Sequence, residues 1–361
     1  MRQRRVRNSA HLVIDKMKEG SQTINSTNTT SAINTVSDSI NKINNDDNTL
    51  EVIGQLQNMS TADNDASICA NCGKEGANNT CNKCKQVNYC NAACKKKHRH
   101  KHKKDCEEHL KQVAELHDEK LFKLPPQQED CPICFLLLPL LSTGSQYNSC
   151  CGKMPCCGCI HAMEMENRKG DKTKLCPFCR TPEPQSGEKL IEQMKKRVDI
   201  GDTYAMNNLG YYYSEGMYGL QQNMNKAFEL RYRAAELGHV GACFHIGNVY
   251  QEGRTVNRDM KKAVYYWEQA AIGGDAYSRH NLGAFEWNSG NIGRALKHWL
   301  ISVVGGNQDS LKCIQELYLD GDATKDEYSK ALRAYQKYLG EVKSSQRDEA
   351  VAFDEDYKYT E

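Results

Sequence analysis

The chain has 361 residues, which suggests two or three domains at about 150 residues per domain. Lys and Arg (48) nearly balance Asp and Glu (46), so the net charge of +2 does not favour a polyanionic partner. Cysteine is the outlier, because 16 of the 18 cysteines lie between Cys69 and Cys179. No apolar run approaches the ~18–20 residues of a membrane span. We therefore expect a cytoplasmic or nuclear protein with no membrane partner, whose clustered thiols bind metal rather than form disulfides.

Changes in composition divide the chain into six expected segments. The N-terminal one is rich in Asn, Ser and Thr and has no aromatic residue, which is typical of a disordered segment. Two cysteine-rich modules with a charged helical connector between them follow, and then cysteine almost disappears. The segments are the disordered N-terminus (1–66), the first cysteine module (67–108), the connector (109–127), the second cysteine module (128–182), helical repeats (183–340) and a solvated acidic tail (341–361).

A repeat is visible after the second cysteine module. An alanine that follows Lys or Arg recurs at intervals of 36, 32 and 36 residues, at Ala227, Ala263, Ala295 and Ala331. Each unit predicts two amphipathic helices, and Gly238, Gly274 and Gly306 separate the units. One unit cannot bury its own apolar face, so neighbouring units are expected to stack into a solenoid. Residues 189–201 predict a lone helix that caps its front.

The pattern AxxxLGxxYxxG followed by KAxxxxxxAAxxG is clearest over residues 242–274. It resembles the Sel1-like repeats, which are relatives of the tetratricopeptide repeats, and the resemblance covers about residues 189–340. It implies a concave surface that holds a protein partner, not a reaction. An aromatic stripe could line that surface, but its helical spacing favours a role in the core. The stripe comprises Tyr211, Tyr212, Tyr213, Tyr265, Tyr266 and Trp267.

The first cysteine module offers eight ligands, which implies two zinc ions because a structural zinc takes four. These are Cys69, Cys72, Cys81, Cys84, Cys90, Cys94, His102 and Cys106. His102 and Cys106 are four residues apart and project from one face of a helix. Spacing alone does not decide between sequential and interleaved pairing of the ligands.

This spacing resembles the MYND zinc finger, down to Tyr89 and Lys103 beside the ligands. The resemblance implies interleaved sites, Cys69, Cys72, Cys90 and Cys94 for one ion and Cys81, Cys84, His102 and Cys106 for the other. Peptide-binding members carry Gln and Trp where this chain has Lys95 and Arg99, which argues against capture of proline-rich peptides.

A basic run, KKKHRHKHKK, occupies residues 95–104. Such a run is compatible with a nucleic-acid partner or with nuclear import. No stacking aromatic is interleaved with it, so we favour a solvated helix face over nucleic-acid binding. His98 and His100 are expected to be surface residues, although His98 lies one turn before His102 and is an alternative ligand.

The second cysteine module has nine cysteines for the eight positions that two zinc ions would require. Its outer pairs, CPIC and CPFC, are unambiguous. The segment resembles a RING finger in an all-cysteine variant, with Lys153 near the place of the usual histidine. The resemblance implies one site of Cys131, Cys134, Cys156 and Cys159 and another of Cys150, Cys151, Cys176 and Cys179. Cys157 is left over, and the choice among Cys150, Cys151 and Cys157 stays open.

Three residues match the positions by which RING ubiquitin ligases act. Ile133 lies in the first CxxC and Pro177 in the last, where the resemblance implies contact with a ubiquitin-conjugating enzyme. Arg180 follows the last ligand, where a basic residue contacts both that enzyme and ubiquitin. The alternative is that Ile133 and Pro177 belong to a small core and that Arg180 is a surface charge.

The expected fold is multidomain, with two small zinc-stapled cross-brace modules followed by an all-α helical-repeat solenoid. Four zinc ions are expected, two per module, with no open coordination position and no covalent catalytic residue. The leading hypothesis is a RING-type ubiquitin ligase or ligase adaptor that holds a charged conjugating enzyme on the second module and a protein substrate on the repeats. The alternative is a non-enzymatic zinc-finger scaffold or transcriptional regulator that acts through protein–protein contacts.

Overall fold

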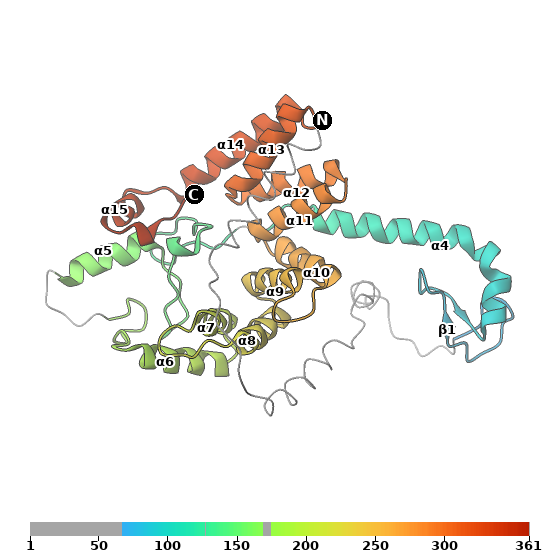
Figure 1. Cartoon of the computed structure of the whole chain (residues 1–361), viewed down its shortest axis with the longest axis horizontal. Coiled ribbons are helices and arrows are strands. Elements are labelled where there is room, and N and C mark those ends of the chain that lie inside the picture. The colour runs from blue at the N-terminus through green and yellow to red at the C-terminus, as the bar shows by residue number, and fades with distance from the viewer. Residues whose placement is uncertain (1–66, 127, 169–174, 361) are drawn as a thin grey trace. The chain divides into compact units, whose positions relative to one another are not determined.

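The computed structural model describes residues 67–126, 128–168 and 175–360 (Figure 1). The disorder predicted for residues 1–66 concerns residues outside these ranges. Among the described residues, no helix combines the length and the apolar character needed to cross a membrane.

The first cysteine module pairs two short strands with the start of a long helix. Strands β1 (Asn79–Thr80) and β2 (Asn88–Tyr89) are antiparallel. Helix α4 (Ala92–Leu121) begins at Asn91, whose side chain accepts a hydrogen bond from the Cys94 amide and caps the helix. No Gly or Pro interrupts this helix, so the predicted connector is its continuation. The expected boundary at residue 108 lies inside one continuous helix.

The second cysteine module consists mainly of loops around one helix. Its short regular elements are the 3-10 turn η2 (Ser142–Gly144) and helix α5 (Cys157–Arg168). Isolated antiparallel bridges join Asp130 to Leu137 and Leu175 to Pro182, so each outer CxxC pair lies at the tip of a small hairpin.

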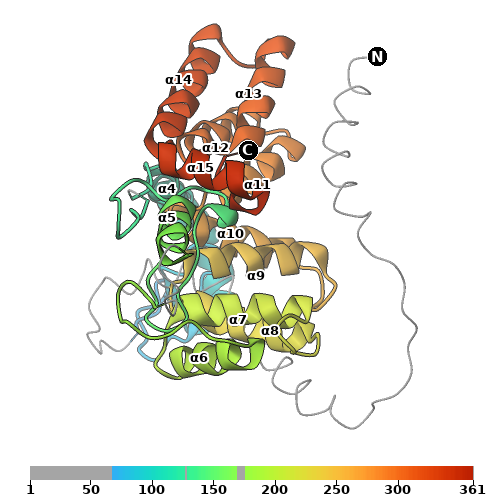
Figure 2. The same cartoon turned by 90° about the vertical axis from the view of Figure 1, so that its left-hand side faces the viewer.

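The repeats form a series of helical hairpins, as predicted (Figures 1 and 2). Gly238, Gly274 and Gly306 have positive φ angles of 84°, 104° and 93° in the turns between units, a conformation that favours glycine. Helix α6 caps the front, as the sequence predicts for residues 189–201. The helices are α6 (Gly187–Asp199), α7 (Thr203–Glu215), α8 (Met224–Glu236), α9 (Val240–Glu252), α10 (Met260–Ile272), α11 (Ala276–Asn288), α12 (Ile292–Val304), α13 (Gln308–Asp320) and α14 (Lys325–Val342).

A glycine in the first helix of a hairpin allows a large side chain of the second helix to lie against the backbone. A Cβ atom on Gly247 would lie 2.5 Å from Cδ1 of Trp267, and one on Gly283 would lie 2.4 Å from Nε1 of Trp299. Gly210 has the same relation to Arg231, at 3.0 Å from its Cγ. This explains why Leu-Gly or Ile-Gly recurs in every one of these first helices.

The aromatic stripe belongs mostly to the core, as its spacing predicted. Trp267 is 1% exposed, and Tyr213 and Tyr266 are each 7% exposed. Tyr212 and Tyr265 are partly buried against the same core, while Tyr211 is 47% exposed. The two cysteines of the repeats also pack inward, Cys243 as a buried residue and Cys313 as a partly buried one.

The second module contacts both the first and the last helices of the series. The Tyr147 hydroxyl donates to Oδ2 of Asp202 (2.8 Å), and Ser149 donates to Gln193 (2.7 Å). At the other end, the amide of Leu140 donates to the Tyr338 hydroxyl (2.7 Å). The module is therefore held by the solenoid on two sides, and its folding does not rest on its own residues alone.

The predicted solvated tail is wrong. Helix α14 continues to Val342, and helix α15 (Ser345–Phe353) and the turn η3 (Glu355–Tyr357) follow. Helix α15 packs against α5 (Figure 1), and Arg347 and Tyr359 are 0% and 6% exposed. The sequence did not predict this packing because the segment is acidic overall and its buried residues are few and widely spaced.

Replacing Gly247 by Ala is expected to destabilise the solenoid by about 1–3 kcal/mol, because the added Cβ overlaps the rigid, buried ring of Trp267. The matched control is Gly340→Ala in the exposed last turns of α14, where a Cβ would meet no atom within 4 Å. That change should raise stability by up to about 1 kcal/mol through helix propensity. Urea unfolding followed by helical circular dichroism measures both. Shifts of the same sign would contradict this packing.

Candidate metal centres

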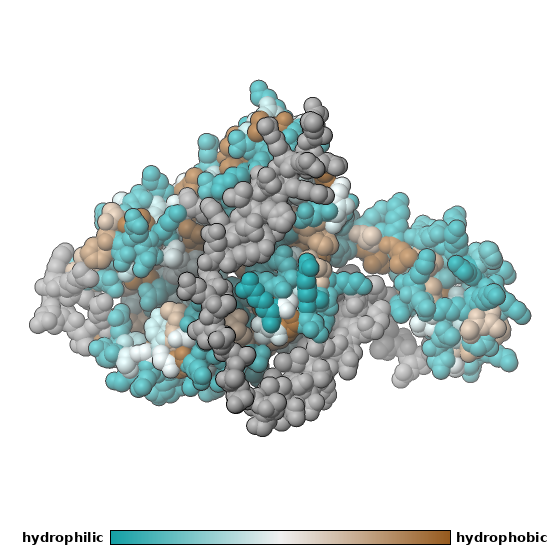
Figure 3. Space-filling view, viewed as in Figure 1, coloured by the Kyte–Doolittle hydropathy of each residue, from teal (hydrophilic) through white to brown (hydrophobic). Residues whose placement is uncertain are grey.

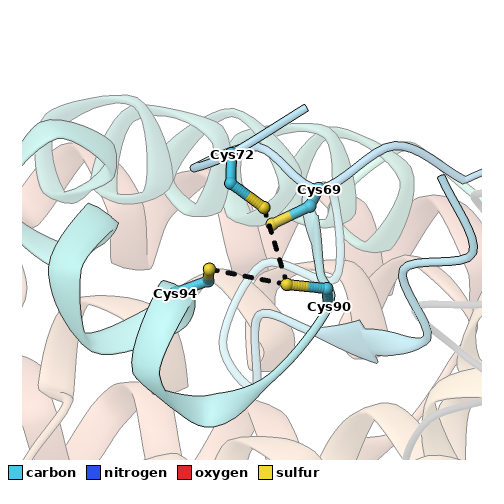
Figure 4. A group of neighbouring side chains, drawn as sticks. All are labelled: Cys69, Cys72, Cys90 and Cys94. Carbon is cyan, nitrogen blue, oxygen red and sulfur yellow. Dashed lines mark hydrogen bonds between the residues drawn. The ribbon is translucent and has the colours of Figure 1, made fainter. Parts of the chain in front are cut away.

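Four cysteines from two segments converge in the first site of the first module (Figure 4). Sγ of Cys72 lies 3.6 Å from Sγ of Cys90, and Sγ of Cys90 lies 3.5 Å from Sγ of Cys94. Cys94 belongs to the first turn of α4, so the Asn91 cap also sets the position of this ligand. With Cys69 the set is the interleaved one that the MYND resemblance implies.

The second site of this module joins a CxxC turn to the next turns of α4. Nε2 of His102 lies 3.2 Å from Sγ of Cys84, and Cys81 and Cys106 are 4.0 Å apart. All four side chains are largely buried.

His98 is not a plain surface residue, contrary to the sequence interpretation. Its Nδ1 lies 3.2 Å from the Tyr89 hydroxyl, and its ring stacks on that of His102 with centroids 6.1 Å apart. His98 is therefore placed to orient the ligand His102 and is not itself in a ligand set. The one-turn spacing to His102 was the signal that could have predicted this role.

Two more groups of four thiols form in the second module. Cys131 lies 3.9 Å from Cys159, and Cys134 lies 3.7 Å from Cys156, between sulfur atoms. The other group is Cys150, Cys151, Cys176 and Cys179, with Cys151 and Cys176 3.6 Å apart. Cys157 is in neither group. It is buried with Tyr338, Val342 and Tyr359, in a core made with the C-terminal segment.

The geometry of these groups fits tetrahedral zinc. Within each group all four ligand atoms lie within 4.8 Å of one another. Bonds of about 2.3 Å to a central zinc place the sulfurs about 3.8 Å apart, close to the observed separations. All eighteen cysteines are free thiols, so no disulfide competes for them. Four protein ligands complete each tetrahedron, which suits a structural metal and leaves no position for a catalytic water.

Electrostatics also favours a bound cation. A hydrogen bond from Cys156 lowers the pKa of Cys131 to about 4, while the same interaction raises the pKa of Cys156. In the neighbouring group, a hydrogen bond with Thr181 lowers the pKa of Cys179 to about 6, and burial raises the pKa of Cys150. Without a cation, one thiolate therefore forces its neighbour to keep a proton. A divalent cation would allow all four to ionise.

The four CxxC turns share one backbone conformation. In each, the residue after the second cysteine is left-handed, with φ angles of 71° at Gly73, 56° at Lys85, 58° at Phe135 and 61° at Arg180. Its amide donates to the carbonyl of the first cysteine, for example from Arg180 to Cys176 at 3.0 Å. Three of the four positions are not glycine, although that conformation costs about 1–2 kcal/mol per residue. Lys85, Phe135 and Arg180 therefore adopt a strained backbone conformation.

The basic run of α4 is not a uniform solvated face. Nζ of Lys95 donates to the Thr80 carbonyl and to Oδ1 of Asn82, each at 2.6 Å, so Lys95 ties the helix to the β1 region. The rest of the run is mainly exposed, and the surface over this module is predominantly hydrophilic (Figure 3). Among the described residues of the run, Lys103 pairs with Glu107 at 3.9 Å.

Comparison with known families identifies two parts of the chain. Residues 69–106 match the MYND finger, and residues 203–239 and 240–275 match the Sel1 repeat. The chain therefore contains a MYND finger and Sel1 repeats. In the structure the same helical-hairpin arrangement continues beyond residue 275, through α14. These modules indicate a zinc-binding protein that interacts with other proteins.

Known relatives and structures match only parts of the chain. An Arabidopsis thaliana protein named E3 ubiquitin-protein ligase DA2 is 35% identical over 77 residues, which are 19% of this chain and 18% of the relative. A Sel1 repeat protein from Oxalobacter formigenes is 28% identical with a TM-score of 0.33, over 35% of this chain and 97% of that one. The antigen c5321 of uropathogenic Escherichia coli, with an SLR fold, is 24% identical with a TM-score of 0.37, over 45% and 36% of the two chains.

We expect four zinc ions per chain in the purified protein, two per module, measured by elemental analysis. Cys150→Ala should lower the content to three, because it removes a member of a group of four. The matched control, Cys157→Ala, removes a buried neighbouring thiol outside both groups and should leave four. A loss of zinc from Cys157→Ala, with none from Cys150→Ala, would overturn this assignment.

Proposed function

We propose that the protein is a RING-type ubiquitin ligase or ligase adaptor that works in the cytoplasm or nucleus. Residues 128–182 would recruit a ubiquitin-conjugating enzyme, and the repeats would hold a protein substrate. Its catalytic effect would be positioning, because bringing a substrate lysine to a ubiquitin thioester raises their effective concentration without a covalent step on this chain.

One observation supports this proposal above the others. Ile133 and Pro177 lie in the tips of the two hairpins closed by the Asp130–Leu137 and Leu175–Pro182 bridges. Arg180 directly follows the last cysteine of the second hairpin and, like Pro177, is exposed. Pro177 and Arg180 are therefore accessible to a partner at the tip of this hairpin.

The surroundings of these residues suit a protein partner. Phe135 is 77% exposed and Leu175 is 43% exposed, and each flanks one of the two CxxC turns. Pro177 is exposed as well, while Ile133 is partly buried against Leu138 and the cysteines of its site. Exposed apolar side chains beside an arginine are typical of the residues that carry binding energy in protein interfaces.

The similarity to a protein named an E3 ubiquitin-protein ligase supports the same proposal. This chain spans less than a fifth of that relative, so we assign ligase activity to this chain only as a proposal.

Part of the solenoid is already covered by the chain itself. Nε2 of His117 in α4 lies 3.2 Å from Glu268, and its hydrogen bond to Glu268 raises the pKa of His117. Asp118 pairs with Arg294, and the rings of Phe122 and His298 are 4.7 Å apart. A substrate would therefore bind the first helices of the hairpins, where Tyr211 is half exposed.

The test is ubiquitin transfer by the full-length protein with a panel of conjugating enzymes. Ile133→Ala and Arg180→Gly should each lower the rate at least about tenfold, as expected for interface residues worth more than about 1.4 kcal/mol. Arg180→Gly also relieves backbone strain, so its zinc content and stability should be kept or improved. The matched control is Lys85→Gly, the same backbone position in the MYND finger, which should leave transfer unchanged.

Transfer with no enzyme of the panel, or equal rates for Arg180→Gly and the unchanged protein, would contradict the ligase proposal. In that case, stable protein partners captured through the MYND finger or the repeats would support the non-enzymatic scaffold instead.

A further inference from the structure

The C-terminal helix α15 carries an arginine that is buried without enough partners. Arg347 is 0% exposed. Its Nη1 donates to the carbonyls of Leu137 (2.9 Å) and Val342 (2.6 Å). The other donors, Nε and Nη2, have no hydrogen-bond partner of good geometry among the described residues. Burying a cation with unpaired donors is strongly unfavourable, so a compensating negative charge is expected nearby.

Thiols of the second module lie close by and are able to carry that charge. A Cβ on Gly158 would lie 2.7 Å from the Arg347 amide nitrogen and 3.0 Å from its Cγ. Arg347 therefore lies directly on α5, at the glycine between Cys157 and Cys159. Its Nη1 donates to the carbonyl of Leu137, three residues after the ligand Cys134, so the guanidinium lies beside this site.

Neutral thiols are weak hydrogen-bond acceptors and would compensate a guanidinium poorly. The same site with zinc is different, because four thiolates around one Zn²⁺ carry a net double negative charge. Zinc-bound sulfurs are also good acceptors for donors outside the coordination shell. When the site binds metal, it therefore acquires the negative charge that the buried Arg347 needs as a partner.

We infer that Arg347 is the counter-cation of the metal site formed by Cys131, Cys134, Cys156 and Cys159. Metal in this site and docking of the C-terminal segment then stabilise each other, although Arg347 lies far from the ligands in the sequence. The inference rests on zinc binding by the second module, which the proposed function also requires, but not on ubiquitin transfer.

By thermodynamic linkage, the free energy by which bound metal stabilises docking of α15 equals the free energy by which docked α15 stabilises the bound metal. Removing the positive charge should therefore loosen the metal even though no ligand changes. Replacing a hydrogen-bonded neighbour of metal ligands typically weakens binding about 10–100-fold.

The experiment uses the full-length protein and follows zinc release to a chelating dye. Arg347→Met keeps the length of the side chain and removes the charge, and one of the four ions should leave at least about tenfold faster. Arg347→Lys keeps the charge and should release that ion more slowly than Arg347→Met. The ions of the MYND finger serve as an internal reference and should leave at the unchanged rate.

A packing control separates charge from shape. Val342→Ala loosens the same contact, since Val342 is 0% exposed in the core shared with Cys157, but it leaves the charge in place. Val342→Ala should lower the melting temperature, but it should release zinc more slowly than Arg347→Met does. Equal release rates for the two variants, or an unchanged rate for Arg347→Met, would overturn the inference.

Hydrogen exchange of α15 gives the reciprocal readout. Its amides should lose protection when zinc is stripped from the unchanged protein, and protection that survives stripping would overturn the inference. A second module that holds no zinc would overturn it as well. Zinc-dependent protection in a protein that transfers no ubiquitin would support the inference and contradict only the ligase proposal.

Discussion

Mutual repulsion among clustered thiolates is the constraint on which the first half of this protein depends. In each of the four groups, the four ligand atoms lie within 4.8 Å of one another, and the cysteines are free thiols rather than disulfides. Such groups are stable as neutral thiols or around a cation, and only the cation lets every sulfur ionise. The left-handed CxxC turns, the Asn91 cap and the stacking of His98 on His102 all serve to aim these ligands.

The solenoid solves a different problem, that of bringing helices close together. In two of the hairpins a glycine in one helix and a tryptophan in the next let the backbone and a large ring touch, so these helices pack through complementary shapes. The series then acts as a frame. It holds the second cysteine module through Asp202 near its start and Tyr338 near its end. A small loop-rich module thereby shares the core of a larger domain.

This arrangement connects the two roles in the proposed ligase. A protein held on the repeats and an enzyme held on the second module would be separated by a frame with direct contacts to both. The C-terminal segment completes the frame, since Arg347 joins the last helix to the cysteine module and Gly158 allows the close approach. In the proposed ligase, this frame would set the distance from substrate to ubiquitin thioester.

Sequence alone determined the elements with strong local periodicity or spacing. The repeat intervals predicted the helical hairpins, the glycine turns and the mostly buried aromatic stripe, because each depends on neighbours in the chain. Cysteine spacing predicted the ligands, and the resemblance to the MYND and RING fingers implied the same four sets that the structure brings together. Tertiary structure decided what depends on distant partners. The roles of Lys95 and Arg347, and the folding of the acidic C-terminal segment, depend on contacts with other segments that local composition does not encode.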